Sequence, residues 1–195
     1  MAPAMRRDGI AMDTLTDSLL DELRAVVARV DGQAVNEACA ALAGAGRIAV
    51  YGCGREALQM KGFAMRLFHL GLPVSVVGDM TAPALGQGDV LFASSGPGET
   101  GTVLSLMRTA REAGAGVLLI TAQPASSAAR LADRLILVPA QTMADDRGEG
   151  RRSAFPMGSL FEGAMFVLFE MMVLKLKQKL GVDDEAMRAR HTNLE

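Results

Sequence analysis

The sequence has few aromatic residues, few cysteines and histidines, and no excess of charge of either sign. Only 4% of its 195 residues are aromatic, none is tryptophan, and 20 Lys and Arg nearly balance 22 Asp and Glu. A near-neutral chain offers no broad basic surface for nucleic acid, and few rings are available to stack on bases. We therefore expect no nucleic-acid partner.

Metal and disulfide frameworks are also missing from the pattern. The two cysteines, Cys39 and Cys53, lack CxxC spacing, and there are only two histidines. This predicts no metal site and fits a reducing compartment.

Segments that would direct the chain to a membrane are not evident either. Residues 1–7 carry two arginines without the apolar stretch of a signal peptide, and the apolar region 164–176 is interrupted by Glu170. That region is too short and too polar to span a bilayer. We expect a cytoplasmic protein with no membrane partner.

Half of the residues are hydrophobic, and their arrangement predicts the fold. Short apolar runs alternate with helical patterns, a texture typical of a parallel sheet covered on both faces. We predict an α/β three-layer sandwich with five parallel strands in the order 2-1-3-4-5. The predicted strands are 47–51, 74–77, 89–93, 116–120 and 134–138, and the predicted helices between them are 57–70, 102–113 and 127–132.

Additional helices are expected at both ends of this unit: 14–30 and 33–42 before it, 158–180 and 183–190 after it. Residues 1–12 are expected to be a flexible N-terminus, and 13–195 a single domain. The polar segment 140–153 is either a solvated excursion, which we favour, or a rim of the active site.

The last long helix is apolar nearly all round its first half and therefore needs cover on every side. In so small a chain we expect another subunit to supply it. Flexible thioethers fill irregular gaps, so we expect the methionines of this region to pack between subunits. They are Met157, Met165, Met171 and Met172.

Two glycine-bearing loops follow the first and third predicted strands, at residues 52–56 and 95–100. Ligands of open parallel sheets bind beyond the carboxyl ends of the strands, and free N–H groups at helix N-termini there suit an anion. Four hydroxyls near the second loop could instead cap a helix, but two such loops at one sheet edge favour a ligand site. A dinucleotide site is disfavoured, because Ala57 stands where the third glycine of that fingerprint belongs.

The segments 52–71, 89–100, 156–162 and 190–195 together resemble the sugar isomerase (SIS) domain family, and within it the 6-phospho-3-hexuloisomerases. The first of them includes GCGRE and FAMRLFHLG; the last is RHTNLE. The resemblance implies a flavodoxin-like SIS fold and a homotetramer, or homodimer, with a shared active site. It also implies interconversion of hexulose 6-phosphate and fructose 6-phosphate.

The same resemblance implies the site residues. The family's general base falls on Glu162, its C-terminal histidine on His191, and no metal or cofactor is implied. The substrate, a sugar or sugar phosphate, would be bound by the two loops, at Gly54, Arg55, Glu56, Ser94, Ser95, Gly96, Pro97, Gly98, Glu99 and Thr100.

Two residues depart from the family's pattern, which has serine at both positions. Glu56 places a carboxylate where a phosphate-binding hydroxyl is expected, and Pro97 lacks both an N–H and a hydroxyl. Glu56 could turn away while neighbouring residues compensate, the substrate could be another anionic sugar, or the activity could be altered. A sugar-binding SIS protein is the alternative from a different class.

The reaction itself suggests a role for the carboxylate of Glu162. Moving a carbonyl between adjacent sugar carbons proceeds through an enediol, for which a carboxylate partly shielded from water is a suitable base. Glu162 lies at the start of an apolar helix, where it could equally balance the helix dipole; the family resemblance favours catalysis. His191 could relay protons in a neighbouring subunit's pocket. His69, before Gly71, is expected to be structural.

Overall fold

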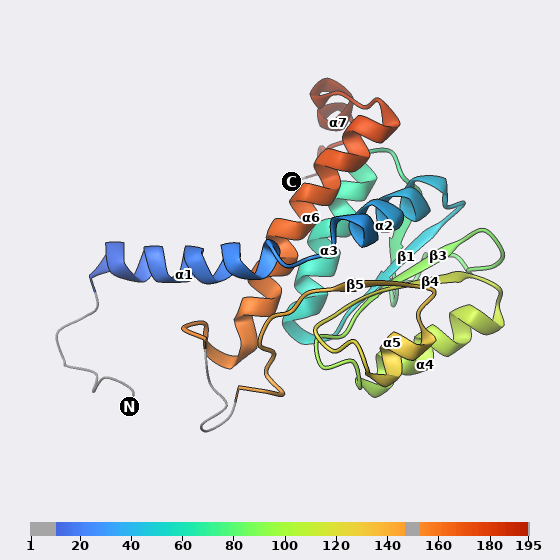
Figure 1. Ribbon diagram of the computed structural model, residues 1–195. Coiled ribbons are helices and arrows are strands. Elements are labelled where there is room, and N and C mark those ends of the chain that lie inside the picture. The colour runs from blue at the N-terminus through green and yellow to red at the C-terminus, as the bar shows by residue number, and fades with distance from the viewer. Residues whose placement is uncertain (1–10, 147–152, 195) are drawn as a thin grey trace.

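The computed structural model describes residues 11–146 and 153–194. The chain alternates helices and strands, as the apolar pattern predicted (Figure 1). In order, the elements of the described residues are α1 (Met12–Val27), α2 (Gly32–Gly44), β1 (Ile48–Tyr51), α3 (Gly54–His69), β2 (Val74–Val76), β3 (Val90–Ser94), α4 (Gly101–Glu112), β4 (Gly116–Thr121), α5 (Ser127–Leu131), β5 (Arg134–Leu137), the 3-10 helix η2 (Pro156–Gly158), α6 (Ser159–Leu180) and α7 (Asp184–Ala189).

The five strands form one parallel sheet in the order β2-β1-β3-β4-β5, which confirms the predicted fold class. Strand order reverses between β1 and β3, where Ile48 pairs with Val90 and Tyr51 with Ala93. All five residues of β3 are buried, because helices cover this strand on both faces. The carboxyl ends of β1 and β3 therefore open at a common edge, where an open parallel sheet places its ligand site.

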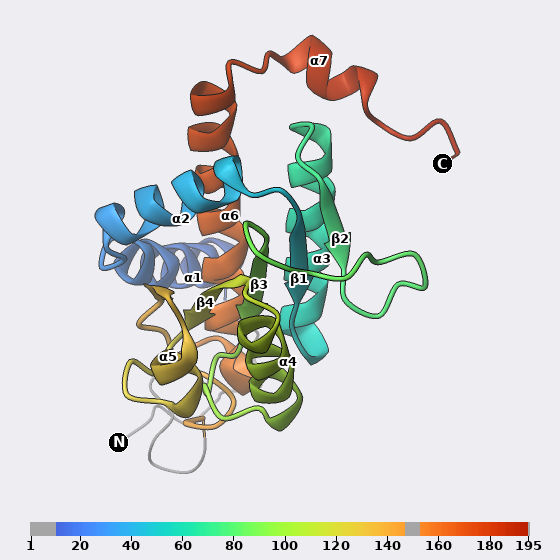
Figure 2. The same cartoon turned by 90° about the vertical axis from the view of Figure 1, so that its right-hand side faces the viewer.

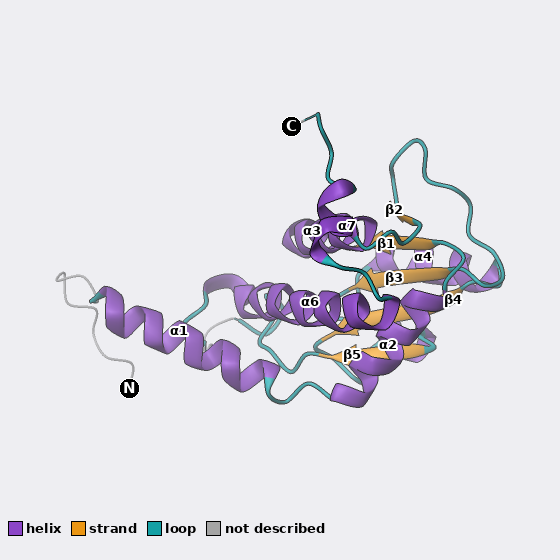
Figure 3. Cartoon of the chain, turned by 90° about the horizontal axis from the view of Figure 1, so that it is seen from above, coloured by secondary structure: helices purple, strands orange, loops and turns teal. Residues whose placement is uncertain are grey.

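The two faces of the sheet are packed differently (Figure 3). α2, α3 and α6 cover one face and α4 and α5 the other. Alternate strand residues point to opposite faces, so Val50 and Phe92 belong to the α3–α6 core while Ala49 and Ala93 belong to the α4–α5 core.

Large rings fill the α3–α6 core. Phe63 of α3 stacks on Phe169 of α6 at a centroid distance of 4.4 Å, and Phe92 meets both rings edge-on at 5.9 Å. Such aromatic contacts contribute roughly 0.5–1.5 kcal/mol each beyond their buried area. They join α3, α6 and β3 below the sheet edge where the two glycine loops begin.

α1 extends away from the sheet and packs on α6 near its own C-terminal end (Figures 1 and 2). Most of the expected flexible N-terminus, residues 1–10, lies outside the described residues, and Met12 already belongs to α1. Residues 147–152 of the expected loop lie outside them as well.

α6 is longer than the apolar stretch recognised in the sequence. With the turn before it, Pro156–Leu180 is long and apolar enough to cross a membrane by length and composition alone. The length argument made from 164–176 was therefore wrong. Half of the helix's most apolar window is buried within this fold, however, and the core helix of a folded domain passes the same test.

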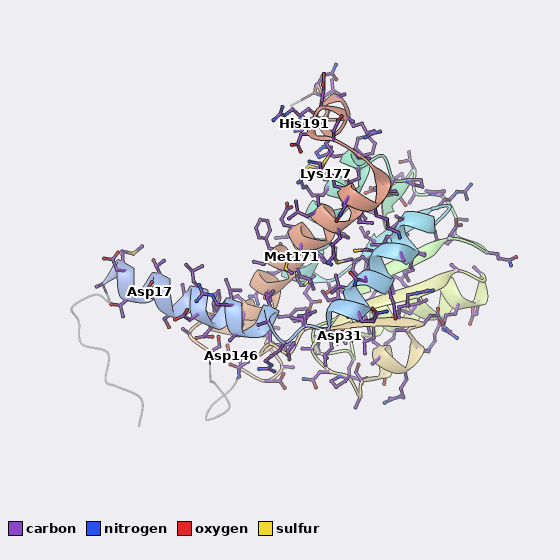
Figure 4. The ribbon with its side chains drawn as sticks, turned by 45° about the horizontal axis from the view of Figure 1, so that its top comes forward. Asp17, Asp31, Asp146, Met171, Lys177 and His191 are labelled. Carbon is purple, nitrogen blue, oxygen red and sulfur yellow. The ribbon has the colours of Figure 1, made fainter. Side chains whose placement is uncertain are left out.

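The methionines of this region do not share one role. Met165 and Met172 are fully buried in the core of their own chain, so their predicted packing between subunits is wrong. Met157 and Met171 are exposed, and Met171 lies on the outer side of α6 (Figure 4). The neighbouring outer surface of α3 and α6 also exposes large apolar side chains: Leu58, Met65, Phe68, Phe166 and Leu174.

Candidate active site

The first glycine loop turns the chain from β1 directly into α3. Gly54, the first residue of α3, has φ +58, in the left-handed region. A Cβ on Gly52 would lie 3.2 Å from the backbone nitrogen of Ala57, so glycine lets the helix start close to the strand. As a result, Arg55 and Glu56 lie in the first turn of α3 and face the edge of the sheet.

The second loop is held by hydrogen bonds to itself and to its neighbours. The Ser95 hydroxyl lies 2.9 Å from that of Thr100 and accepts from the Gly98 N–H at 3.0 Å. Thr121, at the end of β4, donates its hydroxyl to the Gly96 carbonyl at 3.2 Å. The Thr100 side chain forms no cap with α4, so at this residue the hydroxyl braces the loop and not the helix.

Glu56 joins the first loop to the second. Its carboxylate accepts a hydrogen bond from the Ser94 hydroxyl, and both of its oxygens lie 3.0 Å from the Gly96 nitrogen. Burial raises the pKa of Glu56, and the nearby Glu162 carboxylate adds to this. The two hydrogen bonds and Arg55 lower the pKa but do not cancel the rise.

Glu162 is held from one side only. One of its oxygens, Oε1, pairs with the Arg55 guanidinium at 3.1 Å. Its other oxygen, Oε2, is buried and has no hydrogen-bond partner in the described part of the chain. A buried acceptor without a partner is costly, so such a group is a candidate for function.

A strained turn positions Glu162. Met157 adopts φ 56, a conformation uncommon for a residue with a side chain, and Arg55 donates a hydrogen bond to its carbonyl. At Gly158, with φ 71, a Cβ would lie 2.1 Å from the Met143 nitrogen. This turn brings the start of α6 against the 142–146 segment and places Glu162 in the first turn of the helix.

These residues surround a cavity of about 550 Å³, within the usual range for small-molecule sites. Two carboxylates and one guanidinium are the charged groups among the described lining residues. The lining consists of Cys53, Gly54, Arg55, Glu56, Pro97, Thr100, Met143, Ala144 and Glu162.

Most of the site residues implied by the sequence line this cavity or lie in the second loop beside it. Six of them line it, and Ser94, Ser95, Gly96 and Gly98 are buried in the second loop. Glu99 does not line it; its exposed carboxylate accepts from the Ser127 N–H at 2.7 Å.

His191 is not brought to this cavity within the chain. Its ring stacks on His69 with centroids 5.3 Å apart, at the C-terminal end of α3. That is roughly 20 Å along α3 from Glu56, at 1.5 Å per residue. Figure 4 shows His191 near α7, while Asp146, which accepts from the Gly158 N–H, lies at the opposite end of α6. His69 is buried there.

Sequence reasoning missed three lining residues: Cys53 of the first glycine loop, and Met143 and Ala144. The last two belong to the segment 140–153, for which a solvated excursion was favoured, and its described part contributes to the rim. The unusual backbone of Met157 also left no signal, because the residue is neither glycine nor asparagine.

Comparison with known proteins agrees with this architecture. The SIS domain family matches residues 41–151. A protein of Mycobacterium gastri named 3-hexulose-6-phosphate isomerase is 37% identical over the full length of both chains. One of the same name from Bacillus subtilis (strain 168) is 33% identical over 91% of this chain and 95% of its own.

A solved structure shares the fold. It is the crystal structure of a Methanococcus jannaschii protein, from which a molecular function of 3-hexulose-6-phosphate isomerase was inferred for that protein. It superposes on this chain with a TM-score of 0.81. The match covers 93% of this chain and 99% of the other at 23% identity. With its family match, its full-length relatives and its 2-1-3-4-5 sheet, the chain belongs to the SIS domain family.

Proposed function

We propose that the protein is a sugar-phosphate isomerase that interconverts hexulose 6-phosphate and fructose 6-phosphate. Curated relatives at 33–37% identity, aligned over most or all of their length, carry the name of this activity. The observation that carries the mechanism is the free Oε2 of Glu162 in the wall of a cavity of suitable size.

Glu162 is the general base in this proposal. Fructose 6-phosphate has its carbonyl at C2, so the base takes the proton from C3 to form an enediol shared by C2 and C3. Returning the proton to C2, as the C3 oxygen becomes the carbonyl, completes the shift. Because Arg55 holds Oε1 of Glu162, the other oxygen keeps a fixed direction, and such positioning of a catalytic group lowers the barrier.

His191 is the second proposed catalytic group, as a proton relay between the enediol oxygens. Since it lies at the far end of α3 in its own chain, we place it in the site of a neighbouring subunit. The large apolar side chains that α3 and α6 expose support such an assembly, because burying them against another subunit would remove apolar area from water. We propose a homotetramer, or a homodimer, on this basis.

A sugar-binding protein without catalysis is the second candidate. Glu56 and Pro97 favour it, because they replace hydroxyls expected to hold a phosphate, and both line the cavity. Binding and catalysis differ in what Glu162 does, so one measurement separates them.

The test is carbon-bound deuterium exchange. Incubation with fructose 6-phosphate in deuterated water should place deuterium at C3, and Glu162→Gln should reduce the rate by about 10²–10⁴-fold, the usual contribution of a general base. Glu112→Gln, an exposed residue at the end of α4, makes the same charge change and should leave the rate unchanged. Saturable sugar binding without exchange would favour the second candidate.

A further inference from the structure

We infer that Glu56 is a specificity-determining residue whose carboxylate occupies the anion-binding position of the 94–98 loop and competes there with the phosphate of a sugar ester. The inference rests on the proposed function and concerns the substrate's anionic group. The inference depends on which groups accept hydrogen bonds from the donors of residues 94–98.

The Ser94 hydroxyl and the backbone N–H groups of residues 95–98 are already committed. The Ser94 hydroxyl and the Gly96 N–H both bind the Glu56 carboxylate. The Ser95 N–H donates to the Ile120 carbonyl at 3.1 Å, Pro97 has no N–H, and the Gly98 N–H donates back to Ser95. An incoming phosphate therefore finds neither the Ser94 hydroxyl nor a backbone N–H group of residues 95–98 free.

The geometry of the bound carboxylate is that of an anion in its site. Backbone N–H groups between a parallel strand and the helix that follows it are ordinary ligands of phosphate and carboxylate. Glu56 reaches them from α3, across the sheet edge, so the chain supplies its own anion. A phosphate can bind the same groups only after Glu56 has moved away.

The charges of the residues that line the cavity also oppose the binding of a phosphate. Among the described residues that line the cavity, Arg55 is the cation, and it is paired with Glu162 and bonded to the Met157 carbonyl. Glu56 and Glu162 already bring two carboxyl groups to this wall, and a phosphate would add up to two more negative charges. Repulsion between like charges in a partly buried site is stronger than in water, which opposes the ester further.

Removal of the carboxylate should therefore strengthen the binding of phosphate esters selectively. Isothermal titration calorimetry with fructose 6-phosphate, inorganic phosphate and fructose compares the wild type with Glu56→Ser and Glu56→Gln. We expect Glu56→Ser to bind fructose 6-phosphate and phosphate roughly tenfold more tightly or better, while the affinity for fructose changes less than about twofold.

Glu112→Gln is the control for net charge and should leave all three affinities unchanged. Should Glu56→Ser fail to fold, Glu56→Gln keeps the shape of the side chain without its charge and should show a smaller gain in the same direction. An unchanged or weaker affinity for fructose 6-phosphate in the folded variants, or no binding in any of them, would overturn the inference.

The proposed function and this inference fail separately. Deuterium exchange that Glu162→Gln does not reduce would overturn the assigned base and leave the affinities untouched. Normal exchange with no gain in affinity on loss of the Glu56 carboxylate would overturn only the role given to Glu56.

Discussion

The two glycine loops at the sheet edge are built in opposite ways. The loop 94–100 is bonded internally and to the ends of β4 and α5, and most of it is buried. The loop 52–56 has few such bonds and sends its two charged side chains across the cavity, Glu56 to the other loop and Arg55 to α6. The second loop is therefore a rigid frame, and the first supplies the groups that define the site's charge. This difference leads to distinct expectations for substitutions in each loop.

The largest effect on stability is expected at Gly98. Its φ is +69, and a Cβ there would lie 2.1 Å from the Oγ and 2.3 Å from the Cβ of Ser126. Ser126 cannot move freely because its hydroxyl accepts from the Ala129 N–H to cap α5. Gly98→Ala should lower the free energy of unfolding by about 3 kcal/mol or more, the sum of backbone strain and overpacking, as measured by urea denaturation.

Gly54→Ala is the matched control in the first loop. Gly54 has a similar φ of +58, but apart from its two neighbours and the backbone of its own helix no atom of the described residues lies within 4 Å of the position of its Cβ. Only the cost of the left-handed conformation remains, about 1–2 kcal/mol. If both variants lost the same free energy of unfolding, the second loop would accommodate an added Cβ as easily as the first loop does, which would contradict its description as rigid.

A smaller effect is expected from Ser95→Ala. The substitution removes the hydroxyl that contacts Thr100 and accepts from the Gly98 N–H, although that N–H keeps its 3.0 Å bond to the Ser95 carbonyl. Loss of side-chain hydrogen bonds in a buried loop should cost about 1–2 kcal/mol in the same denaturation experiment. Thr102→Ala, which removes an exposed hydroxyl in the first turn of α4, should change stability by less than about 0.5 kcal/mol. A similar loss in both would contradict the idea of a braced loop.

The sheet and both loops could be predicted from the sequence because their signals are local. Predicted apolar strands of four or five residues, glycines after β1 and β3, and helical spacing in between lead to the 2-1-3-4-5 order through general rules of α/β folds. Side-chain contacts across the sequence could not be predicted in this way. The bond of Glu56 to Ser94 and Gly96 joins residues about 40 positions apart, and it depends on which way one rotamer turns.

The same limit explains why neither the burial of the methionines in α6 nor the position of Met143 at the cavity could be predicted. Met165 and Met171 are both part of an apolar run, and only the packing of α6 against α1, α2 and α3 decides which of them is buried. Met143 reaches the cavity because the Met157–Gly158 turn contacts its backbone. The polar residues that follow Met143 in the sequence favoured a solvated excursion over a rim of the active site.

The smallest expected effect is a pH dependence at the contact between the loops. Burial raises the pKa of Glu56 above that of the unfolded chain, with Glu162 adding to the rise and Arg55 opposing it. The folded protein therefore keeps this proton to a higher pH than the unfolded protein does, and stability from this group declines as pH rises above the ordinary titration range of glutamate. Glu56→Gln cannot titrate and lacks this decline. The free energy of unfolding of the variant minus that of the wild type should thus increase from pH 4 towards neutrality, as measured by urea denaturation at a series of pH values. If the hydrogen bonds from Ser94 and Gly96 outweighed burial, folding would lower the pKa of Glu56, and the difference would change in the opposite direction.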